Sequence, residues 1–160
     1  MQFNELSGKH VSIVGLGPSS ATYVDHVKRL GGASTYCDEV WAINGMGDVL
    51  KCDRIFHMDD VRVQEIRAEA KPASNIAFML RWLRKHPGPI YTSHVEPGYK
   101  GLVAYPLSKV VKQFSEAYFN STVPYALALA IYAGVDRISL FGCDYSYEQS
   151  HKAERGRACL

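Results

Sequence analysis

The sequence has 160 residues, a length that suits one domain with a full hydrophobic core. Hydrophobic residues make up 47% of the chain and charged residues 21%, which is the ordinary balance of a globular protein. The formal net charge of +2 gives no electrostatic reason to bind nucleic acid or an anionic membrane, so neither is an expected partner.

The cysteines and the hydropathy pattern exclude further classes of protein. Four cysteines stand far apart, and no two of them form a C-x-x-C pair. This spacing argues against a zinc site and against a disulfide framework. The sequence shows neither a secretory signal segment nor an apolar run long enough to cross a membrane. We therefore expect a cytoplasmic protein without a membrane span, with residues 1–160 forming a single domain.

Strand and helix patterns alternate along the chain. Short apolar runs predict strands at 10–14, 39–43, 54–58, 89–92 and 137–141. Longer patterns predict helices at 20–30, 61–70, 74–86 and 122–133, and a last helical segment from about residue 151. Glycines and prolines predict loops at 31–34 and 87–89 and an irregular segment at 93–106. The alternation predicts a single Rossmann-like α/β domain with a mainly parallel sheet flanked by helices.

The first strand runs into the most informative motif, Gly-Leu-Gly-Pro-Ser-Ser at 15–20. Gly15 and Gly17 let the backbone turn tightly and approach a ligand closely. The helix that follows aims unpaired N–H groups and the positive end of its dipole at that place, where phosphate is the usual occupant. The motif predicts a nucleotide or phosphate site. The alternative is a plain strand–turn–helix in which Ser19 or Ser20 only caps the helix.

A dinucleotide redox cofactor fits this loop poorly. The NAD fingerprint requires a third glycine where Ser20 stands, and an acidic residue at the end of the second strand, where this chain has Asn44. Pro18 also stiffens the loop and removes one backbone donor. We therefore expect no redox cofactor.

Small or polar residues follow four of the predicted strands. Gly15 to Ser20 follow the first strand, Asn44 the second, Asp59 and Asp60 the third, and Gly142 to Tyr145 the last. In a parallel sheet these strand ends meet at one edge, where ligands bind. The sequence thus predicts one shared cleft. The alternative is that strand ends simply lead into turns, which are rich in such residues.

The predicted helix at 122–133 supplies a second anion site. It is apolar on every side, and such a helix is buried. Its start carries Ser121, Thr122 and Pro124, which are typical of the first turn of a helix. The N-terminus would therefore lie inside the molecule near the strand ends. There Ser121 and Thr122 either bind a ligand or only cap the helix.

Three aspartates near the predicted cleft could bind a ligand or cap a helix. Asp59 is a candidate for holding a divalent metal that bridges phosphates, or for accepting ribose hydroxyls. Asp60 is predicted to cap the helix that begins at Val61. Asp144, directly after the last strand, could either bind a ligand or cap.

Among the histidines, His151 is the candidate catalytic residue, because imidazole moves protons near neutral pH. The alternative is a surface histidine at a helix start. His57, inside the third predicted strand, is predicted to be a core histidine with satisfied partners. His94, in the irregular segment, is expected to line the cleft.

These motifs together resemble the bacterial sialyltransferases that use CMP-sialic acid. They also resemble the related domain family that includes motility-accessory proteins, archaeal-type 6-hydroxymethylpterin diphosphokinases and small phage-encoded proteins. The shared pattern covers residues 10–151. It comprises Gly-x-Gly-Pro-Ser from Gly15 to Ser19, a strand-ending Asn44, a hydroxyl-bearing loop at Ser121-Thr122, and Gly-x-Asp-Tyr from Gly142 to Tyr145.

The resemblance implies a role for several residues. It places a cytidine nucleotide on Gly17, Pro18, Ser19, Asn44, Ser121 and Thr122, and it makes His151 the general base. The family's Thr-Ser-Gly loop reads Ser-Thr-Val here, so Val123 stands in place of a glycine. The full set of expected nucleotide-binding residues is Gly15, Gly17, Pro18, Ser19, Ser20, Asn44, Asp59, Ser121, Thr122, Gly142, Asp144 and Tyr145.

Three functions remain open at this point. The first is a transferase for a nucleotide or nucleotide sugar that moves a glycosyl group without a metal. The second is diphosphokinase-like phosphoryl transfer, in which Mg²⁺ is held by Asp59, with Asp144 as a further candidate ligand. The third is a non-catalytic protein that binds or sequesters a nucleotide. Each is compatible with a homo-oligomer. The phosphate-loop hypothesis also predicts that Gly17→Val abolishes nucleotide binding in a folded protein.

Overall fold

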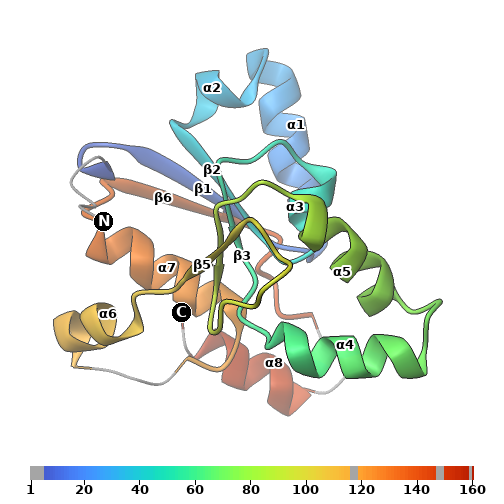
Figure 1. The fold of residues 1–160 in the computed structure, drawn as a ribbon. Coiled ribbons are helices and arrows are strands. Elements are labelled where there is room, and N and C mark those ends of the chain that lie inside the picture. Colours follow the sequence, from blue (N-terminus) through green and yellow to red (C-terminus); the bar gives the residue numbers. More distant parts are fainter. Residues whose placement is uncertain (1–5, 116–118, 147–149, 159) are drawn as a thin grey trace.

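The computed structural model describes residues 6–115, 119–146, 150–158 and 160. Within these residues the fold is α/β, with six strands in a single all-parallel sheet (Figure 1). The strands are β1 (His10–Val14), β2 (Glu39–Ile43), β3 (Arg54–Phe56), β4 (Ile90–Thr92), β5 (Leu102–Ala104) and β6 (Arg137–Phe141). The predicted fold class, a parallel sheet flanked by helices, is confirmed.

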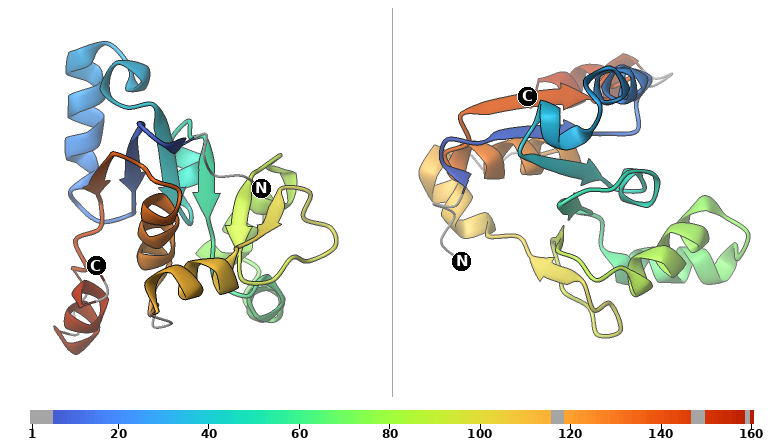
Figure 2. Two further views of the ribbon diagram at one scale, coloured as in Figure 1. Left: turned by 90° about the vertical axis from the view of Figure 1, so that its left-hand side faces the viewer. Right: turned by 90° about the horizontal axis from the view of Figure 1, so that it is seen from above.

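Helices cover both faces of this sheet, as the two views of Figure 2 show. The helices are α1 (Ser20–Leu30), α2 (Ala33–Tyr36), α3 (Met46–Val49), α4 (Val61–Ala70), α5 (Asn75–Lys85), α6 (Leu107–Phe114), α7 (Thr122–Tyr132) and α8 (Ser150–Arg157). None of the described helices has the length and apolar character needed to cross a membrane.

Two hydrophobic clusters hold the layers together, because alternate residues of each strand point to opposite faces. On one face Val11, Ile13 and Trp41 pack against α6 and α7. On the other face Val14 and Ala42 pack against α1 and α5. The strands are apolar on both faces, as expected of a parallel sheet covered on both sides.

Helix α7 is the most deeply buried helix of the described chain. Seven of its eleven residues are buried, and they pack across β1, β2 and β3. The prediction that this apolar helix lies inside the molecule is confirmed. Its N-terminus is consequently held close to the carboxyl edge of the sheet.

The main differences from the predicted elements concern short segments. Residues 93–106 were expected to be irregular, but Leu102–Ala104 form edge strand β5, which pairs with β4. The third strand ends at Phe56 rather than at residue 58, and helices α2, α3 and α6 were not predicted. Strand β5 and helices α2 and α3 have only three or four residues, which is too short to show a periodic pattern, so tertiary contacts decide them. Helix α6 has eight residues and was missed by the prediction.

Candidate functional site

The order of strands in the sheet marks where a ligand would bind. The order is β5-β4-β3-β2-β1-β6, so the chain proceeds from β1 in one direction and later returns to place β6 on the other side of β1. In open α/β sheets the crevice beyond the carboxyl ends of the two strands at such a reversal is the usual ligand site. Here it lies between the loop after β1 and the loop after β6, which carry the predicted motifs.

A cavity of about 320 Å³ opens at this point, and we call it the loop pocket. It is lined by Gly15, Leu16, Gly17, Pro18, Ile43, Asn44, Val123, Gly142, Cys143, Tyr145 and Ser146. The structure thus brings together six of the predicted binding residues, drawn from the ends of three strands. Val123, in the first turn of α7, also lines the pocket. The volume falls at the lower end of the range for small-molecule sites.

A second cavity of about 550 Å³ lies beside the loop pocket, and we call it the helical pocket. It is lined by Leu16, Asn44, Gly45, Asp59, Asp60, Val63, Gln64, Arg67, Asn75, Ile76 and Met79. Leu16 and Asn44 line both cavities, so the two form neighbouring compartments. Asp59, which was expected to bind the nucleotide, lines the helical pocket.

The glycines of the first loop pack against protein rather than against open space. Gly15 N donates to Phe141 O at 2.7 Å, and Gly17 N donates to Gly142 O at 2.8 Å. A Cβ on Gly17 would collide with the Asp144 carboxylate and would lie 2.8 Å from Gly142 O. Gly17→Val would therefore strike the protein itself. Loss of binding in that variant would not by itself report on a phosphate.

The contact between the two loops yields a stability prediction for Gly142, whose φ is 65°. A Cβ there would collide with Gly15 O. We expect Gly142→Ala to lower the free energy of unfolding by about 3 kcal/mol, from left-handed strain plus overpacking. Urea denaturation measures it. Gly134→Ala is the matched control: its φ is 72°, but its nearest neighbour is 4.0 Å away, so it should lose only about 1 kcal/mol. Equal losses of unfolding free energy in the two variants would contradict the contact between Gly142 and Gly15.

The N-terminus of α1 is already occupied by Asp144. Ser19 N donates to Asp144 Oδ2 at 3.0 Å, and hydrogen bonds from Ser19 lower the pKa of that carboxyl group. The Ser19 hydroxyl makes no capping bond; it accepts from Gly142 N at 2.8 Å. The N–H groups of Ser20 and Ala21 donate to carbonyl oxygens of the turn. The first turn of α1 therefore has its donors engaged within the protein, and the alternative in which the Ser19 side chain caps the helix does not hold.

The N-terminus of α7 is different. The Ser121 hydroxyl makes no capping bond and lies 2.9 Å from the hydroxyl of Tyr145. No acceptor among the described residues receives the backbone N–H of Thr122 or of Val123. Pro124 has no N–H to satisfy. Both donors, without an acceptor in the part of the chain that the structure describes, belong to the first turn of an eleven-residue helix, beside the loop pocket that Val123 lines. Such a turn is suited to an anion.

His57 is a fully buried histidine with a partner on each ring nitrogen. Its Nδ1 lies 3.1 Å from Asn44 Oδ1 and its Nε2 lies 2.9 Å from Gln64 Oε1. Gln64 Nε2 in turn donates to Asp59 Oδ2 at 3.2 Å. Burial is the main reason that the pKa of His57 is lowered from 6.5. The prediction of a satisfied core histidine is confirmed, and its partners connect the two pockets.

The lowered pKa of His57 predicts how stability depends on pH. Below about pH 6.5 His57 is protonated in the unfolded chain, whereas its lowered pKa keeps it neutral to lower pH in the folded chain. The free energy of unfolding therefore falls as the pH decreases. The loss cannot exceed about 1.4 kcal/mol per pH unit. Urea denaturation between about pH 7.5 and about pH 5 should show a shallower fall in His57→Gln than in the wild type. An unchanged slope, matching that of the exposed control His94→Gln, would contradict this assignment.

The remaining predicted residues lie as follows. Asp60 caps α4 as predicted, because its carboxylate accepts from Arg62 N at 2.9 Å. Ser20 begins α1 and is half-buried. His151 is exposed in the first turn of α8 and lines neither pocket. His94 is exposed beside Glu96 and also lines neither. Among the described residues, no three His, Cys, Asp or Glu side chains are grouped so that they could hold a metal ion.

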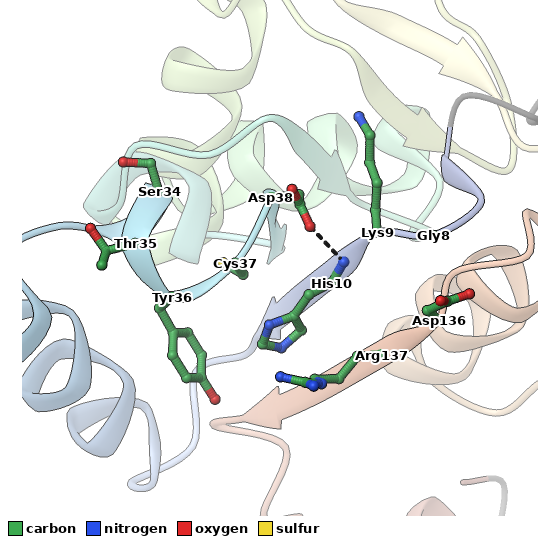
Figure 3. A pocket seen from close by; sticks show the side chains of 10 residues that line it. All are labelled: Gly8, Lys9, His10, Ser34, Thr35, Tyr36, Cys37, Asp38, Asp136 and Arg137. Carbon is green, nitrogen blue, oxygen red and sulfur yellow. Dashed lines mark hydrogen bonds between the residues drawn. The ribbon is translucent and has the colours of Figure 1, made fainter.

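A third cavity, of about 360 Å³, lies at the amino ends of β1, β2 and β6. Figure 3 shows the side chains of His10, Tyr36 and Arg137 gathered together, while Lys9 points in the opposite direction. Several of its polar groups are paired: His10 N donates to Asp38 Oδ2 at 2.8 Å, and His10 Nε2 lies 2.9 Å from Ser139 Oγ. The sequence did not predict this cavity. It occupies the edge opposite to the one where α/β sheets bind ligands.

Comparisons with known proteins add no assignment: no protein-family model matches the chain, and a search of curated proteins gives no match.

Proposed function

We propose that this chain binds a nucleotide or nucleotide sugar in the loop pocket, with a phosphate on the N-terminus of α7. We further propose that it transfers the glycosyl group of such a donor without a metal ion. The observation that carries the proposal is that the N–H groups of Thr122 and Val123 have no acceptor among the described residues and lie beside a cavity at the strand-order reversal.

The proposed chemistry follows from the charges at this place. Two backbone donors and the positive end of the α7 dipole favour a phosphate and stabilise the negative charge that grows on it when the sugar departs. Because these donors are part of a buried helix, they need no reorganisation during the reaction. Asn44 lines the pocket and would contact the nucleoside part. His151 would accept the proton of the attacking hydroxyl.

A thermal-shift screen of nucleoside mono- and diphosphates, each with Mg²⁺ and with EDTA, tests this proposal. A ligand that binds the native state raises the apparent melting temperature by mass action. We expect at least one nucleotide to raise it, and by the same amount in EDTA. If EDTA removes the shift, the diphosphokinase-like alternative with Mg²⁺ at Asp59 replaces the metal-free route. If no nucleotide produces a shift, the binding proposal itself fails.

The exposed position of His151 favours one further candidate, a non-catalytic protein that binds or sequesters a nucleotide. A general base must reach the hydroxyl that it deprotonates, and His151 lines neither pocket. The two candidates share the binding site and differ in turnover. Nucleotide binding without release of a transferred or hydrolysed product would favour this second function.

A further inference from the structure

The chain of side chains from Asp59 to Asn44 determines what the cleft can recognise. It runs Asp59–Gln64–His57–Asn44, with distances of 3.2, 2.9 and 3.1 Å between successive polar atoms. Three of the four residues line the pockets, and His57 is buried beneath them. The side-chain amide of Asn or Gln has two possible orientations, and a neutral imidazole has two tautomers. The donor and acceptor of each hydrogen bond must therefore be assigned step by step from one end of the chain of side chains.

The assignment begins at Asp59, because an ionised carboxylate only accepts. Gln64 must therefore direct its NH₂ group to Asp59 and its carbonyl oxygen to His57. His57 Nε2 then carries the proton and donates to Gln64. Burial lowers the pKa of His57, so the ring is neutral near pH 7 and its Nδ1 holds a lone pair. That lone pair requires a donor from Asn44.

We propose that His57 holds Asn44 with its NH₂ group inward and its carbonyl oxygen toward the cleft. This rests on the proposed function. The site then recognises a hydrogen-bond donor of the ligand, which is a sugar hydroxyl or an exocyclic amine rather than a phosphate oxygen. The Asn44 Oδ1 atom placed 3.1 Å from His57 Nδ1 corresponds to the opposite orientation of the amide, in which two acceptors face each other. The neutral ring requires the amide to be turned.

Asn44 is suited to this role by its backbone. Its φ of 51° lies in the left-handed region, which asparagine tolerates better than most residues. Hydrogen bonds fix the backbone on both sides, since Asn44 N donates to Phe56 O at 2.8 Å and Gly47 N donates to Asn44 O at 3.2 Å. The backbone thus leaves the orientation of the Asn44 side-chain amide open, and the hydrogen bond with His57 determines this orientation. His57 and Gln64 are positioning residues.

The titratable groups around His57 are few among the described residues. Asp59 faces it from the segment before α4 and raises its pKa, against the larger effect of burial. From α4 itself the facing group is the neutral Gln64, and from the end of β2 it is the neutral Asn44. Gln64→Glu would add a carboxylate directly on Nε2. The ring would then hold two protons at neutral pH, and Asn44 would turn its oxygen inward.

The test has one arm without any ligand. In protein with ¹⁵N-labelled histidine, long-range ¹H–¹⁵N correlation spectra near pH 7 report which ring nitrogens carry protons. We expect His57 to be neutral with its proton on Nε2, and to be doubly protonated in Gln64→Glu but unchanged in the remote control Gln113→Glu. The His57 signals are identified by their loss in His57→Gln or by through-bond correlation in the wild type. A proton on Nδ1 in the wild type would overturn the proposal.

The second arm uses Asn44→Ala with inorganic phosphate and with the nucleoside 5′-monophosphate that binds best. We expect nucleotide affinity to fall about three- to tenfold, the effect of one hydrogen bond, while phosphate affinity stays within about twofold. An equal loss for both probes, or for neither, would overturn the proposal. If the wild type binds no nucleotide, the proposed function fails while the spectra still decide the orientation of Asn44.

Discussion

Ser121→Asp is expected to lower nucleotide affinity by about a hundredfold or more while α7 stays formed. Aspartate is a favoured N-cap residue, and its carboxylate would accept the free N–H of Val123. The same carboxylate would stand where the phosphate binds. Two unit charges about 4 Å apart repel by roughly 4 kcal/mol at an effective dielectric constant of about 20. Isothermal titration calorimetry with the best nucleotide of the screen measures the loss.

Ser121→Ala is the matched control for that substitution. It removes the hydroxyl that lies 2.9 Å from Tyr145 but leaves the two N–H groups free. We expect its nucleotide affinity to stay within about tenfold of the wild type, because the substitution removes only one hydrogen-bonding group. Wild-type affinity in a folded Ser121→Asp protein would show that no anion binds at the start of α7.

His151→Ala is expected to lower turnover by about a hundredfold or more and to leave nucleotide affinity within about threefold. A positioned general base contributes typically 10²–10⁴-fold to the rate, and His151 lines neither pocket in the free chain. Steady-state kinetics of donor consumption and direct nucleotide titration separate the two effects.

His94→Ala serves as the control for that measurement, since His94 is likewise exposed and lines neither pocket. Its turnover should match that of the wild type. If His151→Ala also matches the wild type, His151 is a surface histidine. Another group then takes the proton of the attacking hydroxyl. Absence of turnover in the wild type itself would favour the non-catalytic binding protein.

The sequence was sufficient to predict the framework of this fold. The apolar runs of β1, β2 and β6 and the all-round apolar character of α7 are strong periodic signals, and the structure has them where they were expected. The glycines at 15 and 17 were predicted to allow close approach to a ligand, and the structure shows them in close contact with the protein itself. The partner in that approach is Gly142 of the same chain, a contact between residues more than a hundred positions apart that no local pattern reveals.

The details of the site depend on contacts of this kind. The motif predicted an anion at the start of α1, but the carboxylate of Asp144 lies there, whereas two N–H groups at the start of α7 have no acceptor among the described residues. The helical pocket includes Leu16, Val63 and Met79, whose apolar side chains give no functional signal in a sequence. Gln64 lies one helical turn from Asp60, and only the fold shows that it reaches His57.

The most direct test of the central claim is a nucleotide titration of ¹⁵N-labelled protein followed by amide resonances. If a phosphate binds the free donors at the start of α7, the amides of Thr122 and Val123 should show the largest shifts, together with those around Asn44. They should shift in the same direction, though less, with inorganic phosphate. The account would be contradicted if the resonances of Thr122 and Val123 did not move and the largest shifts occurred around Lys9 and Arg137, in the cavity at the amino ends of β1, β2 and β6.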